Sequence, residues 1–239
     1  MPTRGMTLRR WERRREPLSC VSTLARSSTR AAMPSATLSS RSARSAGANP
    51  AQAGKAAAAA YRECSLSLVK NGVYGGMFVA GCVAAALSKN PTVETILQSG
   101  LSVIPEKCRL AESVSFVREQ YQLNQDFEAI AKQIETRYNK YGFAGTVNNL
   151  AFVTLGLLHG NLDYTKTITT AVMCGHDTDC NSGTAGSIAA AAQSYRSLDQ
   201  RWIAPLHDTV KTVVAHFGQG TVSELIERTI KVRNQLNGK

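Results

Sequence analysis

The sequence lacks several features that mark common classes of protein. It has no apolar stretch long enough to cross a membrane, because its longest run, residues 77–87, has the length of a buried helix. Its six cysteines contain no Cys-x-x-Cys pair, which favours free thiols and a reducing compartment, so we expect an intracellular, cytoplasmic protein. It also contains no Gly-x-Gly-x-x-Gly motif and no convincing strand pattern, which argues against a dinucleotide-binding α/β fold.

Acidic residues are scarce at the start of the chain, so the positive charge is uneven. Of the formal net charge of +11, residues 1–60 carry +9 (eleven Lys/Arg minus two Glu) and the remainder carries +2 (seventeen minus fifteen). A nucleic-acid-binding surface is therefore not expected on the remainder, and such binding would depend on residues 1–60. This Arg-, Ser- and Ala-rich segment has too little aliphatic periodicity to form a core, so we expect a disordered tail.

The tail has three interpretations. An Arg- and Ser-rich start is typical of an organelle-targeting peptide, although Glu12 and Glu16 count against it. A basic tail that touches anionic partners is the second interpretation. The third, which we favour, is that the segment stands in place of a missing part of the protein.

Residues 61–239 predict an all-α domain of roughly eight to ten helices joined by short loops. Residues 77–87 are apolar on nearly every side and predict a central buried helix. Apolar residues at helical spacing predict further helices, which begin near Leu110, near Asn124 and after Asn149. Asn90 is expected to cap a helix whose first residue is Pro91, and Asp163 is expected to cap the helix that leads to Gly175. The last two helices are expected over residues 210–217 and 222–230.

The densest polar cluster lies between two predicted helices, at residues 175–182. Gly175 suits the left-handed position just past a helix end, and Asn181 or Ser182 could cap the next helix. Between them, Asp177 and Asp179 could point toward one place, where two carboxylates repel unless a cation or a proton relieves them. Such hard oxygen ligands favour Mg²⁺ or Mn²⁺.

Two other interpretations of this cluster stay open at the level of sequence. The aspartates could be ordinary capping residues of a loop. A zinc site built from Cys174, His176 and Cys180 is also conceivable, although the spacing is not that of a known zinc finger.

A second block, Asn71-Gly72-Val73-Tyr74-Gly75-Gly76, is rich in glycine. It predicts a flexible loop at which the backbone can approach a ligand closely, with a plain turn into a helix as the alternative.

Both blocks resemble a known family. The run that begins Gly175-His176-Asp177-Thr178-Asp179-Cys180-Asn181 and continues into a Gly- and Ala-rich helix is similar to the C-terminal signature of the ADP-ribosylglycohydrolases, a family that includes jellyfish-lens crystallin relatives. Residues 71–80 resemble its upstream Gly-rich loop, and the resemblance extends over residues 61–232. It implies an all-α bundle with two Mg²⁺ ions that hydrolyses a glycosidic bond to ADP-ribose or a related nucleoside.

The resemblance also implies roles for individual residues. Asp177 and Asp179 would be metal ligands, with Thr178 and Cys180 near the metal, although a neutral thiol is a poor ligand for Mg²⁺. Tyr74, Gly75 and Gly76 would line the side of the cleft that holds ADP-ribose. The partner would be an ADP-ribose-type small molecule or an ADP-ribosylated protein.

Parts of the family pattern are missing before Asn71, namely a Gly-Asp pair and a Ser/Thr-Asp-Asp cluster. We therefore expect a C-terminal portion with an incomplete site, whose helices at Met77 and Gly183 expose apolar faces that promote self-association. The catalytic residue is unknown, since Glu63 and Glu94 are candidates by charge alone. The alternative is a non-catalytic relative, either a crystallin-like structural protein or an ADP-ribose-binding protein.

Overall fold

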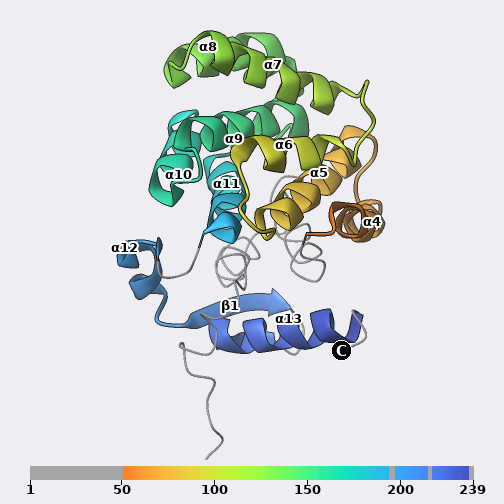
Figure 1. Ribbon diagram of the computed structural model, residues 1–239, viewed down its shortest axis with the longest axis vertical. Coiled ribbons are helices and arrows are strands. Elements are labelled where there is room, and N and C mark those ends of the chain that lie inside the picture. The colour runs from red at the N-terminus through yellow and green to blue at the C-terminus, as the bar shows by residue number, and fades with distance from the viewer. Residues whose placement is uncertain (1–50, 194–196, 215–216, 237–239) are drawn as a thin grey trace, which may run out of the picture.

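The computed structural model describes residues 51–193, 197–214 and 217–236. These residues form ten α-helices, two 3-10 helices and one two-stranded sheet, which confirms the prediction of an all-α fold (Figure 1). The elements are α4 (Ala53–Cys64), α5 (Asn71–Ala86), α6 (Val93–Leu101), α7 (Arg109–Leu123), α8 (Phe127–Tyr138), η1 (Asn139–Tyr141), α9 (Thr146–Gly160), α10 (Tyr164–Met173), α11 (Thr178–Ala192), α12 (Gln200–Ile203), η3 (Ala204–Leu206), β1 (Thr209–Val214), β2 (Phe217–Thr221) and α13 (Val222–Leu236).

The helical domain begins earlier than predicted, because α4 crosses the expected boundary at residue 60. Five consecutive alanines at residues 56–60 have the highest intrinsic helix propensity, and Ala56, Ala57 and Ala60 are buried in the packing of α4 with α5. Small side chains thus provide a packing face that aliphatic periodicity does not reveal. Residues 1–50, the remainder of the predicted tail, lie outside the described part of the chain.

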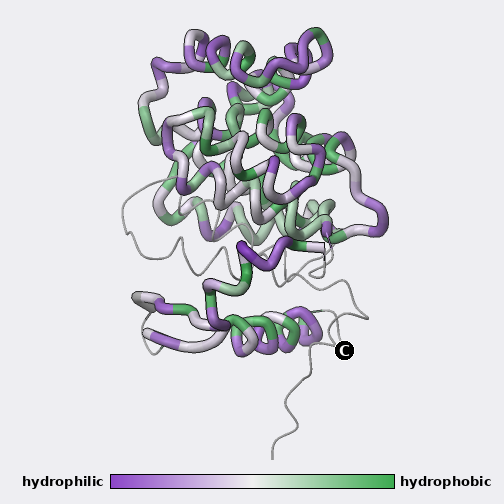
Figure 2. The backbone as a smooth tube through the Cα atoms, turned by 90° about the vertical axis from the view of Figure 1, so that its left-hand side faces the viewer, coloured by the Kyte–Doolittle hydropathy of each residue, from purple (hydrophilic) through white to green (hydrophobic). Residues whose placement is uncertain are grey.

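Helices that follow one another along the chain pack mostly as neighbours. α5 contacts α4 and α6, α9 contacts α7, α8 and α10, and α11 packs against α10, α9 and α5. α7 and α8 lie at one end of the bundle, whereas β1 and α13 lie at the other (Figure 1). Hydrophilic and hydrophobic residues alternate along α13, as expected for an amphipathic helix (Figure 2).

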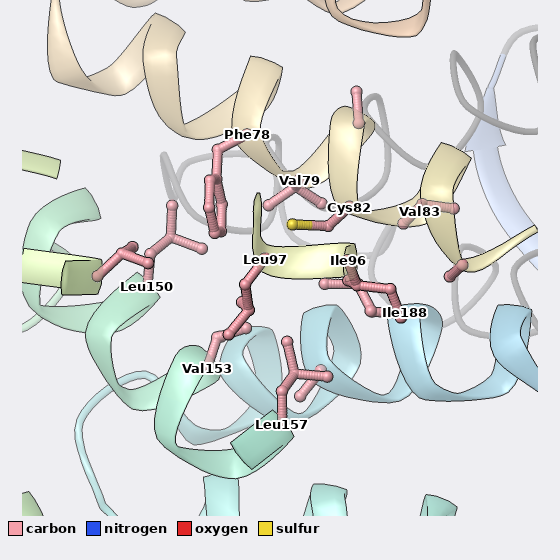
Figure 3. Packing of buried hydrophobic residues seen from close by; sticks show 14 of the residues in the cluster. Phe78, Val79, Cys82, Val83, Ile96, Leu97, Leu150, Val153, Leu157 and Ile188 are labelled. Carbon is pink, nitrogen blue, oxygen red and sulfur yellow. The ribbon is translucent and has the colours of Figure 1, made fainter. Parts of the chain in front are cut away.

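The main core forms around α5, as its apolar sequence predicts. Figure 3 shows Phe78, Val79 and Val83 of α5 facing side chains from α6, α9 and α11, and all three are at most 1% exposed. Along α11, residues 184–190 are all buried. The expectation that the helices at Met77 and Gly183 expose apolar faces is therefore wrong for this structure, because their small residues let neighbouring helices cover them.

The helix predicted over residues 210–217 is replaced by a hairpin. β1 and β2 pair antiparallel, with Thr209 opposite Thr221 and Lys211 opposite Gln219. Val210, Val213 and Val214 have helical spacing, but β-branched residues are also strong strand formers, and here the strand preference prevails. The following helix was predicted correctly, and α13 packs against β2.

Two helix starts differ from the prediction. Thr92 caps α6 instead of Asn90, because its hydroxyl accepts from the Thr95 N–H at 3.1 Å in a reciprocal capping box. α9 begins at Thr146, so that Asn148 and Asn149 lie inside the helix rather than before it. Among the described helices, none combines the length and the apolar character needed to cross a membrane.

Candidate metal centre

The polar cluster occupies the turn between α10 and α11. The Gly175 N–H donates to the Val172 carbonyl at 3.1 Å, and Gly175 adopts the left-handed conformation (φ +78°) predicted for a residue just past a helix end. His176 is also left-handed (φ +57°), and α11 then starts with Asp177 as its N-cap residue. The cap predicted at Asn181 or Ser182 is wrong, because both residues lie inside α11.

Three ligand-bearing side chains meet at this turn. One ligand atom each of Asp177, Asp179 and Cys180 lies within 4.8 Å of the others. Asp177 and Cys180 are only 2% and 5% exposed, whereas Asp179 is exposed. Since the side chain of Asp177 makes no capping hydrogen bond, the simple capping interpretation does not account for its orientation. Thr178 stands in the first turn of α11 and is partly buried.

The zinc alternative receives no support from the described residues. The group of potential ligands found there contains neither Cys174 nor His176. The five cysteines in the described ranges are all free, as predicted from their spacing.

A hydrogen-bonded chain of three side chains flanks the carboxylates. His176 Nε2 contacts the carboxylate of Glu135 on α8, and Asn148 Nδ2 lies 3.3 Å from His176 Nδ1. Asn148 Nδ2 also donates to the Gly142 carbonyl at 2.8 Å. Because the amide nitrogen can only donate, His176 accepts at Nδ1 and carries its proton on Nε2, facing Glu135.

A second polar contact joins α9 to the first turn of α11. Asn181 Nδ2 donates to Asn149 Oδ1 at 2.8 Å, and both side chains are 2% exposed. Asn149 Nδ2 in turn donates to the carbonyls of Phe143 and Gly145, each at 2.9 Å. The loop before α9 is thereby tied to the helix that carries Asp177 and Asp179.

Sequence reasoning missed Glu135, Asn148 and Asn149. Two adjacent asparagines in an otherwise apolar helix were a usable signal, since buried amides need partners from other elements. Glu135 gave no signal, because a lone glutamate on an amphipathic helix is normally a solvated residue.

The predicted substrate loop is not a loop. Tyr74, Gly75 and Gly76 lie in the first half of α5, where both glycines are buried and Tyr74 packs against the main core. In an apolar helix, adjacent glycines permit close packing of neighbours, which explains the departure from the loop prediction. Glu63 lies on α4, and Glu94 pairs with Arg118, so neither joins the carboxylate cluster.

Comparison with known proteins adds one match. The family model described as ADP-ribosylglycohydrolase matches residues 2–236, nearly the whole chain. The search of curated proteins and the search of solved structures found no match.

Proposed function

The chain belongs to the ADP-ribosylglycohydrolase family, and on this premise we propose that it hydrolyses a glycosidic bond to ADP-ribose or a related nucleoside at a Mg²⁺ site held by Asp177 and Asp179. The observation that supports the proposal is the gathering of Asp177, Asp179 and Cys180 ligand atoms within 4.8 Å on the first turn of α11. A substrate of the ADP-ribose type follows from the family.

The donors at the cluster fit a hard divalent cation. Two carboxylates supply oxygen ligands, which hard divalent cations prefer. Asp177 is buried and held by the fold, whereas exposed Asp179 leaves one side of the cluster open to solvent and to a substrate. A bound cation would supply charge stabilisation at the ribose and lower the pKa of a coordinated water.

Two cations would need more ligands than this cluster provides. Mg²⁺ prefers six oxygens, and a neutral thiol such as Cys180 is a poor substitute. Across the described ranges, no second group of three potential ligand side chains accompanies Asp177, Asp179 and Cys180. The described residues thus support one carboxylate pair, and the second cation of the family pattern remains an expectation.

Calorimetric titrations with Mg²⁺ and with ADP-ribose, and an assay for release of ADP-ribose from arginine- and serine-linked peptides, test the proposal together. The Asp177→Asn/Asp179→Asn variant should lose both Mg²⁺ binding and release. Glu106→Gln/Glu227→Gln removes the same charge at exposed positions and should behave like the unmodified chain.

The outcomes separate the candidate functions. Release that depends on Mg²⁺ and on both aspartates supports the hydrolase. Binding of ADP-ribose without its release from either the arginine-linked or the serine-linked peptide identifies a non-catalytic relative. If the unmodified chain binds no Mg²⁺, the proposed metal site is wrong.

A further inference from the structure

We propose that His176, held between Glu135 and Asn148, is a positioning residue that fixes the turn carrying Asp177 and Asp179 in the geometry required for cation binding. The inference rests on the proposed function, because it concerns the same carboxylates. It assigns a role in that site to side chains on α8 and α9, which are distant from the turn in the sequence.

The His176 ring is fixed on three sides. Its two nitrogens contact Glu135 and Asn148, and its ring centroid lies 5.0 Å from that of Phe152, with the two ring planes at 35°. The His176 side chain is 14% exposed, although it belongs to a connecting turn. The ring therefore has one orientation and one tautomer available to it.

The conformation of the His176 backbone links the fixed ring to the orientation of the Asp177 carboxylate. Gly175 and His176 are consecutive left-handed residues, and a non-glycine residue pays an energetic penalty for this conformation. The His176 carbonyl accepts the Thr178 N–H at 2.9 Å, which directs the chain into α11. Because Asp177 directly follows His176, rotation of the His176 backbone would turn the buried carboxylate away from Asp179.

A purely structural explanation of this contact is weak. The Glu135 side chain is 45% exposed, and a hydrogen bond that water can reach contributes only modestly to global stability. The contact joins the outer helix α8 to a turn that packs beside α9, so its effect should be local. Loss of a group that orients a metal ligand typically lowers metal affinity by about 10- to 100-fold.

Titration with Mn²⁺ alone, followed by its electron paramagnetic resonance signal, tests the proposal. Glu135→Ala should weaken Mn²⁺ binding by about tenfold. Glu135→Gln keeps an acceptor for the Nε2 proton and should restore affinity to within about threefold of the unmodified chain. His176→Asn tolerates the left-handed backbone but cannot reach Glu135, so it should resemble Glu135→Ala.

Glu112→Ala is the matched control. Glu112 accepts from Arg137 at 2.7 Å and from Tyr138 at 2.9 Å, so its removal loosens α7 and α8 without touching the turn. It should leave Mn²⁺ affinity unchanged. Equal weakening by Glu112→Ala and Glu135→Ala would overturn the positioning role, because the effect would then follow from loosening of α8.

Amide hydrogen exchange of residues 174–182 separates this inference from the proposed function. Glu135→Ala should accelerate exchange in that segment, and Glu112→Ala should not. Unchanged exchange in Glu135→Ala overturns the inference whether or not Mn²⁺ binds. Absence of Mn²⁺ binding to the unmodified chain overturns the proposed function and, with it, the cation role of His176.

Discussion

At the scale of single residues, close contacts between helices depend on the absence of a side chain. A Cβ atom placed on Gly160, the last residue of α9, would lie 2.6 Å from Thr167 Cα and 2.7 Å from Thr167 N. Because these are backbone atoms of α10, no rotation of a side chain can relieve the overlap. The α9–α10 pair therefore requires glycine at this position.

Gly160→Ala should lower the free energy of unfolding by about 2 kcal/mol or more, because overpacking forces the two backbones apart. Urea denaturation followed by circular dichroism measures the change. Gly54→Ala is the control, since a Cβ there meets nothing within 4 Å, and it should stabilise α4 by about 0.5 kcal/mol. Equal stability of the two variants would contradict the packing argument.

Cys174 should make the stability of the folded protein depend on pH in the alkaline range. Burial raises the pKa of its thiol from the ordinary 9.0 to about 12, so the folded state retains a proton that the unfolded state releases. Its contribution to stability is complete below pH 9 and is lost as the pH rises toward about 12. Urea midpoints of the unmodified chain should fall over this range, and those of Cys174→Ala should fall less steeply. Parallel curves would assign the loss to other groups.

At the scale of helices, the cap of α10 was predicted from sequence and is confirmed. Asp163 Oδ1 accepts the Lys166 N–H at 2.7 Å at the start of the helix that leads into the carboxylate turn. Asp163→Ala should therefore lower the free energy of unfolding by about 1 kcal/mol. Asp163→Asn should lower it much less, because the asparagine side chain can also accept the capping hydrogen bond. Thermal denaturation compares the two, and an equal loss in both would point to charge rather than capping.

Local patterns predicted elements well where spacing and caps agreed. Leu110, Val114 and Val117 correctly indicated α7, and all three are fully buried. The pattern failed at β1, where helical spacing and β-branched composition conflict. Pairing with β2 decides between helix and strand there. It failed again at Gly75 and Gly76, because only the packing around α5 reveals that they lie in a helix.

The part of the candidate site that lies within one short segment could be predicted from sequence. Asp177 and Asp179 are close in sequence, so a short turn suffices to bring them together. Glu135, by contrast, reaches His176 only because α8 packs on α9, which is a tertiary contact. Partners that are distant in sequence leave no local pattern when a single sequence is read.

At the scale of the whole molecule, a bound cation should stabilise the fold through mass action. Mg²⁺ at about a hundred times its dissociation constant should add about 2.7 kcal/mol to the free energy of unfolding. Differential scanning calorimetry with Mg²⁺ and with chelator measures the difference. Asp177→Asn should abolish it, and an undiminished shift in that variant would place the stabilising ion elsewhere.

The order of contacts along the chain has a consequence for how the protein folds. Several of the most extensively packed helix pairs are neighbours in sequence, whereas the packing of α11 against α5 joins segments that lie far apart in the sequence. Contacts with short loops form fast because closing them costs little chain entropy. We therefore expect α9, α10 and α11 to assemble first, with the carboxylate turn already present in that early nucleus, and α5 to dock onto it in the later, slower step.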